Sequence, residues 1–396
     1  MAQQEKGEAP RFGWLCSYTP IEILVAAGLV PTRLDAGDML LQKANPNIYQ
    51  LLCPYIRAVF DTAQAENFGT LEGVLFMKCC DGMLRLYDLW KAHLFEQKAY
   101  VLPTPKIQSP EAMKYFAGAM RRFAETLGKD LGTEVTENAL REAIADANRL
   151  RSAVQRLYQL RSNNPLAMPY SKLRLLIREW LSTTPAQALA SAEKELKAYE
   201  ELRPGGAAPE AKVLVSSSTL DQLRIIELIE EAGMTVVGDD HCSGLRHFDQ
   251  LVSEEGDVYL NLAERYLKRW PCARMQTDPS HLQRLVQEVD AIEANGVIYV
   301  GLKYCDQAGF EVPRLKFLSN ERHIPLLYIE NDYTATGLGQ HKVRIEAFAE
   351  MLLMEALCYA RDLRGLHKVC GEKARGRTQC QSDALQRDRP SRLEHV

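Results

Sequence analysis

The 396-residue chain is long enough for two domains that each bury a core of their own. Its residues are 46% hydrophobic and 25% charged, a composition typical of globular proteins rather than disordered or fibrous ones. The net charge of −4 argues against a general nucleic-acid binder, which needs clustered Lys and Arg to neutralise phosphates.

Nothing in the sequence indicates a membrane or secretory protein. No apolar run approaches the roughly 20 residues that a membrane-spanning helix needs. The first residues, MAQQEKGEAPRFGW, lack the basic-then-apolar order of a signal peptide. We therefore expect a cytoplasmic protein without a membrane partner. In that reducing compartment the ten cysteines should serve metal binding, catalysis or plain burial rather than disulfides.

Residues 1–107 are predicted to form an N-terminal α/β domain. Apolar runs at 29–34, 73–78 and 99–105, bounded by Gly and Pro, are typical of buried strands. Between them, PIEILVAAG and GMLRLYDLWKAHLF have the apolar spacing of helices. This alternation favours a parallel sheet with helices on its faces.

Residues 108–203 are predicted to be a helical segment. Ser109, Pro110 and Glu111 provide a cap, a first-turn proline and an early acid, which together predict a helix start. Apolar residues recur at three- and four-residue steps from Leu140 to Leu160, which indicates a stripe of core packing. The stretch LRPGGAAPEA at 202–211 has the composition of a linker.

A second alternating unit is predicted at 204–360 as a C-terminal α/β domain, followed by an aperiodic, mobile tail at 361–396. KVLVSSS, TVVGDDH, GVIYVGLKYCD and PLLYIENDY are strand-like, and helices are expected at 220–232, 281–294 and 314–322. The predicted fold class is therefore α/β, with two Rossmann-like parallel-sheet domains facing a cleft and a helical insert. Ligands of such domains bind at the carboxyl ends of the strands.

Most cysteines before the last helix fall where a strand meets a loop or a loop meets a helix. Six of the following seven do so: Cys16, Cys53, Cys79, Cys80, Cys242, Cys272 and Cys305. Thiolates prefer zinc, copper(I) or iron–sulfur clusters, and a helix N-terminus stabilises them. The chain has no CxxC pair of the kind that structural zinc usually uses. This pattern favours a cluster at a domain junction over a zinc finger.

Position alone leaves a metal or redox role and plain burial evenly balanced for Cys53, Cys80 and Cys305. Consecutive side chains at a strand end point in opposite directions, so only one of Cys79 and Cys80 is expected to reach the cleft. We interpret Cys79 as structural. Three further cysteines are expected to lie in core or tail without function: Cys358, Cys370 and Cys380.

Around these residues the chain resembles the 2-hydroxyacyl-CoA dehydratase family, which also contains benzoyl-CoA reductase subunits and the double-cubane cluster proteins. The resemblance covers about residues 13–351. Seven short motifs carry it in order: GWLCSYTPIEILVAAGLVPTRL, CPYIRAVF, CCDGMLRLYDLW, HCSGLRHFD, RYLKRWPCARM, GLKYCDQAGFEVPRLK and IENDYTATGLGQHKVRIEAFAEML.

The resemblance implies an oxygen-sensitive 4Fe-4S cluster held at minimum by Cys53, Cys80 and Cys305. It also implies an iron–sulfur activator that hydrolyses ATP and passes on one low-potential electron, and a dimer with an identical or related subunit. The absence of a GxxxxGK[ST] loop from this chain agrees with a separate nucleotide-binding partner. In family dehydratases the electron enters the thioester carbonyl, and the resulting ketyl radical anion expels the neighbouring hydroxyl.

Three further cysteines separate this chain from family members that manage with three: Cys16, Cys242 and Cys272. Six ligands could hold two cubanes, as in the double-cubane relatives, which reduce small molecules. Three functions thus stay open: a 2-hydroxyacyl-CoA dehydratase, a double-cubane reductase, and a benzoyl-CoA reductase-like or electron-carrier subunit. The catalytic residues are unknown, and Glu330 and Asp332 are hypothetical proton carriers.

Hydroxyl groups close to these cysteines are candidate hydrogen-bond donors to the predicted site. The residues are Ser17, Tyr18, Thr19 and Ser243. For Ser17 and Thr19, simple helix capping explains the residue type equally well.

Overall fold

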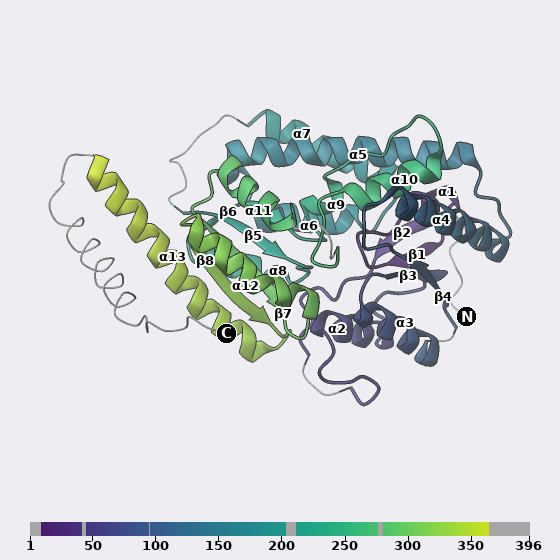
Figure 1. Ribbon diagram of the computed structural model, residues 1–396, viewed down its shortest axis with the longest axis horizontal. Helices are drawn as coiled ribbons and strands as arrows, with labels where there is room; N and C mark the ends of the chain where they lie inside the picture. The colour runs from purple at the N-terminus through teal and green to yellow at the C-terminus, as the bar shows by residue number, and fades with distance from the viewer. Residues whose placement is uncertain (1–8, 42–44, 95, 203–210, 276–279, 364–396) are drawn as a thin grey trace, which may run out of the picture.

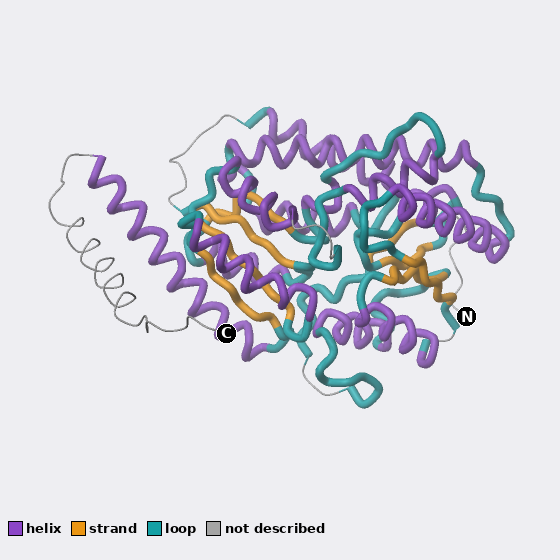
Figure 2. Tube along the Cα trace, in the orientation of Figure 1, coloured by secondary structure: helices purple, strands orange, loops and turns teal. Residues whose placement is uncertain are grey.

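A computed structural model describes residues 9–41, 45–94, 96–202, 211–275 and 280–363. Two parallel four-stranded sheets, each with helices on its faces, are joined by long helices (Figures 1 and 2). This arrangement confirms the predicted α/β class with two parallel sheets. Within the described ranges, no helix is long and apolar enough to cross a membrane.

The first sheet has the strand order β2-β1-β3-β4. Its strands are β1 (Arg11–Trp14), β2 (Val30–Arg33), β3 (Gly73–Lys78) and β4 (Lys98–Pro103). The helices that follow three of them are α1 (Ile21–Ala26), α2 (Pro54–Gln64) and α3 (Asp81–His93). The sequence prediction missed β1, which begins with a charged residue and contains Gly13, a residue type depleted in strands.

The predicted helical segment contains four helices: α4 (Pro110–Leu131), α5 (Glu137–Asn163), α6 (Tyr170–Trp180) and α7 (Pro185–Glu200), with a 3-10 turn at Pro165–Ala167. As predicted, Ser109 caps α4, and its Oγ accepts a hydrogen bond from Ala112 N (3.1 Å). The apolar stripe of α5 is core. Leu140 packs in the core of the first sheet and Leu157 in that of the second, so α5 bridges the two halves.

The second sheet repeats the topology of the first, with the order β6-β5-β7-β8. Its strands are β5 (Lys212–Ser217), β6 (Thr235–Asp240), β7 (Gly296–Leu302) and β8 (Leu326–Asn331). The helices of this half are α8 (Leu223–Glu231), α9 (Leu245–Phe248), α10 (Val258–Lys268), α11 (Ser280–Ala291), α12 (Asp306–Glu321) and α13 (Ala335–Leu363).

Three details differ from the sequence prediction. Helix α12 begins at Asp306 rather than at 314, because it accommodates Pro313 inside the helix instead of starting after it. Helix α10 was not predicted, and it packs against α4 within the core of the first sheet. Helix α13 continues to Leu363, three residues into the segment 361–396 predicted to be aperiodic. Residues 203–210 of the predicted linker and 364–396 lie outside the described ranges, and the predicted domain boundaries stay predictions.

Candidate functional site

The carboxyl ends of the two sheets face one cavity of about 340 Å³. In each sheet the strand order reverses at a switch point, between β1 and β3 and between β5 and β7. Open α/β sheets bind ligands at such points. Residues directly after these four strands line the cavity, among them Cys16, Cys80, Ser218 and Cys305. The fold thus brings two ordinary ligand positions together into one site.

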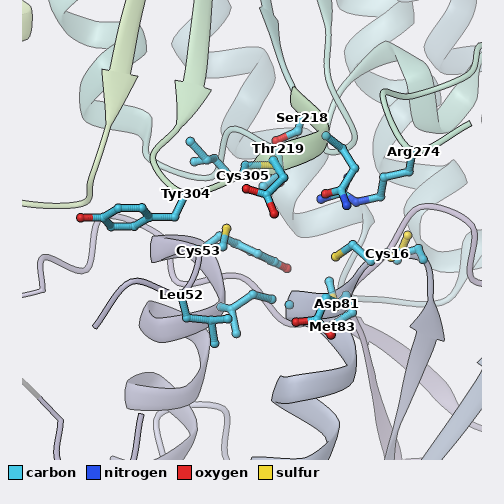
Figure 3. A pocket seen from close by; sticks show the side chains of 18 of the residues that line it. Cys16, Leu52, Cys53, Asp81, Met83, Ser218, Thr219, Arg274, Tyr304 and Cys305 are labelled. Carbon is cyan, nitrogen blue, oxygen red and sulfur yellow. The ribbon is translucent and has the colours of Figure 1, made fainter. Parts of the chain in front are cut away.

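Of the seven cysteines whose side chains the structure describes, six line this cavity: Cys16, Cys53, Cys79, Cys80, Cys242 and Cys305. Figure 3 shows Cys16, Cys53 and Cys305 approaching the cavity from different parts of the chain. Five of the six predicted ligands therefore meet at one place. The sixth, Cys272, is buried and does not line the cavity.

The prediction that only one of the adjacent cysteines reaches the cleft was wrong, because both Cys79 and Cys80 line the cavity. Strand β3 ends at Lys78, so Cys79 already lies in a turn, and its N–H donates to the carbonyl oxygen of Met77 (2.7 Å). Alternation of side chains holds only within a strand, and it ends before these residues.

Cys53, Cys80 and Cys305, here called the outer thiol group, share one local geometry. Each is the residue that precedes the first turn of a helix, α2, α3 and α12 respectively. Helix N-termini present unpaired N–H groups and the positive end of the helix dipole. Three of them converge on this wall of the cavity. The arrangement stabilises negative charge on the sulfurs or on a group bound to them.

The outer thiols differ in acidity because their neighbours differ. Burial and the nearby Cys305 raise the pKa of Cys53 to about 12. A hydrogen bond with Cys79 lowers the pKa of Cys80 well below its ordinary value, and the Arg274 guanidinium adds to this effect. Cys79 keeps the proton, since its hydrogen bonds with Cys16 and Cys80 raise its pKa well above the ordinary value.

Cys16, Cys242 and Cys272, here called the inner thiol group, lie near one another. The charge of Cys16 acts on Cys242, and the charge of Cys242 acts on Cys272. A hydrogen bond with Cys79 lowers the pKa of Cys16 to about 7. Burial opposes ionisation of Cys242, but Arg246, Arg269 and Arg274 together lower its pKa, and Arg246 Nη1 lies 3.8 Å from the sulfur. Burial and Cys242 raise the pKa of Cys272.

Buried positive charge exceeds buried negative charge in the described part of the chain. Seven arginines are buried: Arg33, Arg151, Arg161, Arg174, Arg246, Arg265 and Arg269. Four carboxylates are buried: Glu22, Asp221, Asp239 and Asp240. A buried cation is costly without an anionic partner. Arg246 and Arg269 act on Cys242, and Arg274 acts on Cys80 and Cys305. The positive charge of Arg246, Arg269 and Arg274 near these cysteines therefore fits an anionic, thiolate-bound group in the cavity.

Six thiols from several parts of the chain line the cavity. Within the described ranges, no three His, Cys, Asp or Glu side chains are arranged to hold a single metal ion. Soft thiolates of this kind are the usual ligands of iron–sulfur clusters.

The other predicted polar residues do not line the cavity. Ser17, Tyr18, Thr19 and Ser243 lie behind it, and Ser17 Oγ accepts a hydrogen bond from Arg269 Nη2 (2.7 Å). Glu330 is exposed, and Asp332 Oδ1 accepts a hydrogen bond from Thr334 Oγ1 (2.6 Å). Neither acid faces the cavity, so the structure gives no support to their proposed role as proton carriers.

Sequence reasoning missed several polar residues that line the cavity, among them Arg33, Ser218, Thr219 and Arg274. Ser218 and Thr219 follow β5 at the switch point of the second sheet, and that position was a usable signal. Arg274 lies in the RWPCARM motif two residues after Cys272. Arg33, at the end of β2, had no sequence signal.

Comparison with known proteins identifies the family. Residues 16–352 match the family described as 2-hydroxyglutaryl-CoA dehydratase, D-component. YjiM of Escherichia coli (strain K12), whose name assigns it to the dehydratase subunits, is 29% identical over 366 residues, covering 89% of this chain and 94% of YjiM. The (R)-phenyllactyl-CoA dehydratase beta subunit of Clostridium sporogenes is 23% identical over 355 residues, with coverages of 89% and 94%.

A reductase component is similar to the chain as well. One of the subunits of the benzoyl-CoA reductase of Thauera aromatica is 27% identical over 338 residues, which cover 83% of this chain and 87% of its relative. The family match spans most of the chain and agrees with the cysteine motifs that predicted it. The chain therefore belongs to the 2-hydroxyglutaryl-CoA dehydratase D-component family, whose relatives here are subunits of dehydratases and of benzoyl-CoA reductase.

Proposed function

We propose that this chain is an iron–sulfur subunit of the 2-hydroxyacyl-CoA dehydratase type. It would use a low-potential electron from a separate ATP-hydrolysing activator to eliminate water from a 2-hydroxyacyl-CoA. The main support is the convergence of the outer thiol group, Cys53, Cys80 and Cys305, at three helix N-termini around one cavity. The names of the dehydratase relatives support the reaction class.

The outer thiol group would hold a 4Fe-4S cluster. Such a cluster, when bound, supplies one-electron chemistry at low potential and an iron that can act as Lewis acid. The chain contributes the surroundings. The helix N-termini and Arg274 stabilise the negative charge of the thiolates. Leu52, Ile56 and Met83 form an apolar wall of the cavity, which limits access of water.

Iron analysis after anaerobic purification tests this proposal. We expect about four irons and four sulfides per chain for one cluster, with an electron paramagnetic resonance (EPR) signal after reduction. Cys80→Ser should lose iron while the chain stays folded, and Cys380→Ser, at a cysteine predicted to lie in the tail without function, serves as the control. A folded Cys80→Ser protein with unchanged iron content would contradict the assignment.

The inner thiol group favours a second candidate, a double-cubane reductase of small molecules. Cys242 interacts with both Cys16 and Cys272, and the three provide further thiols, of which Cys16 and Cys242 line the cavity. This candidate predicts about eight irons per chain. Cys272→Ser discriminates between the two candidates, because Cys272 lies off the cavity that holds the outer group. Loss of iron in Cys272→Ser would favour two clusters, whereas unchanged iron would favour one.

We also propose that the chain works in a dimer with an identical or related subunit. Its relatives include beta subunits of dehydratases and one of the subunits of benzoyl-CoA reductase. The mass of the purified chain in solution and its turnover with activator alone test the point. An active homodimer would contradict a role as an electron-carrier subunit, and activity only with a second, related chain would support a heteromeric enzyme.

A further inference from the structure

Four consecutive residues with hydroxyl groups, Ser216 to Thr219, span the end of strand β5 and the start of the following loop. Three of these hydroxyls donate hydrogen bonds to other groups of the protein. Ser216 Oγ donates to Asp240 Oδ2 (3.1 Å), and Ser217 Oγ donates to the carbonyl oxygen of Val300 (2.7 Å). Thr219 Oγ1 donates to an oxygen of Asp221 (3.1 Å). These three hydroxyls hold the loop together and are not available to a ligand.

Ser218 is the exception. Its side chain is buried, with the residue 5% exposed, and it lines the cavity. Within the described ranges its Oγ has no hydrogen-bond partner. A buried hydroxyl without a partner costs free energy, so such groups in native proteins call for an explanation. The backbone holds the residue in place, because Ser218 O accepts a hydrogen bond from Cys242 N (3.1 Å).

Two guanidinium groups on the cavity wall also carry a buried hydrogen-bond donor that has no partner in the described part of the chain. The Nε–H groups of Arg33 and Arg274 are buried and have no hydrogen-bond partner in the described part of the chain. The remaining nitrogens of Arg33 are engaged, with Nη2 3.1 Å from Thr219 Oγ1 and Nη1 3.5 Å from Cys242 O. Arg33 is 4% exposed, so packing and these bonds fix its guanidinium.

The cavity thus has two unlike walls. Figure 3 shows Ser218, Thr219 and Arg274 on one side, and Leu52 and Met83 on the other. The first side supplies hydrogen-bond donors with positive charge, and the second supplies apolar surface together with the carboxylate of Asp81. A small molecule with oxygen atoms on an apolar carbon skeleton is the ligand that matches both walls.

We propose that Ser218 Oγ–H, together with the Nε–H groups of Arg33 and Arg274, binds an oxygen atom of the acyl group of a CoA thioester. Donors fixed in a dry site interact strongly with an oxygen that carries partial negative charge. The proposal rests on the function proposed above and assigns the acyl oxygen to this wall of the cavity.

Ser218→Ala tests the proposal in the full chain purified anaerobically with its iron. Removal of an unpaired hydroxyl should leave the melting temperature and the iron content unchanged. The affinity for (R)-phenyllactyl-CoA, measured by calorimetry, should fall roughly tenfold, as expected for one lost hydrogen bond to a polarised oxygen. The affinity for free CoA, which lacks the acyl oxygen, should stay the same.

Ser217→Ala is the matched control, since its hydroxyl is bonded to Val300 O. Ser217→Ala should lower the melting temperature. It should not reduce the affinity for the thioester more than the affinity for free CoA. Equal thioester affinity of wild type and Ser218→Ala would overturn the proposal, as would a wild-type chain that binds no thioester. A changed EPR spectrum of ligand-free Ser218→Ala would also overturn it, because the hydroxyl would then donate to the bound cluster. The iron content tests the proposed function, whereas the thioester affinity of Ser218→Ala tests this inference.

Discussion

Replacing His281 with Gln tests the buried charge network behind the inner thiol group. The imidazole Nε2 lies 3.0 Å from Asp240 Oδ2, and Nδ1 lies 3.0 Å from Glu311 Oε1. Arg246 approaches the same ring to 3.4 Å and shares Asp240 as partner. Burial disfavours the charged imidazole, but Asp240 and Glu311 together raise the pKa of His281 from 6.5 to about 9.

The size and sign of the effect follow from this shift. The folded-state pKa is higher than the unfolded value, so protonated His281 stabilises the folded chain fully below about pH 6.5. That contribution is lost as the pH rises through about 9. A difference of about 2.5 pKa units corresponds to about 3 kcal/mol. His281 is 3% exposed, so solvent screening reduces this value little.

Urea unfolding under anaerobic conditions at about pH 6 and about pH 10 measures the effect. Between these two values the free energy of unfolding of wild type should fall by about 3 kcal/mol more than that of His281→Gln. His93→Gln, at an exposed histidine of α3, is the control and should behave as wild type. An equal fall in wild type and His281→Gln would refute the reasoning.

Three further substitutions test other parts of the structure. Glu22→Gln should lower the free energy of unfolding by about 3–5 kcal/mol, because it leaves buried Arg151 without its anionic partner; chemical denaturation measures this loss, and no change would contradict it. Leu157→Ala removes a fully buried side chain of α5 and should cost about 2–5 kcal/mol by the same assay. Gly244→Ala would place a Cβ 2.7 Å from Cγ of Asp239. It should displace the loop that carries Cys242. For the double-cubane candidate it should therefore lower the iron content, and unchanged iron would count against Cys242 as a ligand.

Local pattern was enough to predict most of the secondary structure and the fold class. Seven of the eight strands follow from apolar runs that are bounded by Gly and Pro or end in polar loops, because burial on both faces of a parallel sheet demands such runs. The cap at Ser109 and the stripe of α5 follow from equally local rules. Strand β1, helix α10 and the start of α12 needed more than local information.

The sequence by itself also determined that cysteines stand at the ends of strands and the starts of helices, and hence the family. It could not determine which side chains meet. Cys79 enters the cavity and Cys272 stays outside it, although their sequence positions suggested the opposite. Ser218 and Arg33, which sequence reasoning missed, come from different sheets and lie on the same wall. Side-chain direction in a loop depends on packing between segments that are far apart in the chain, and only the tertiary structure fixes that packing.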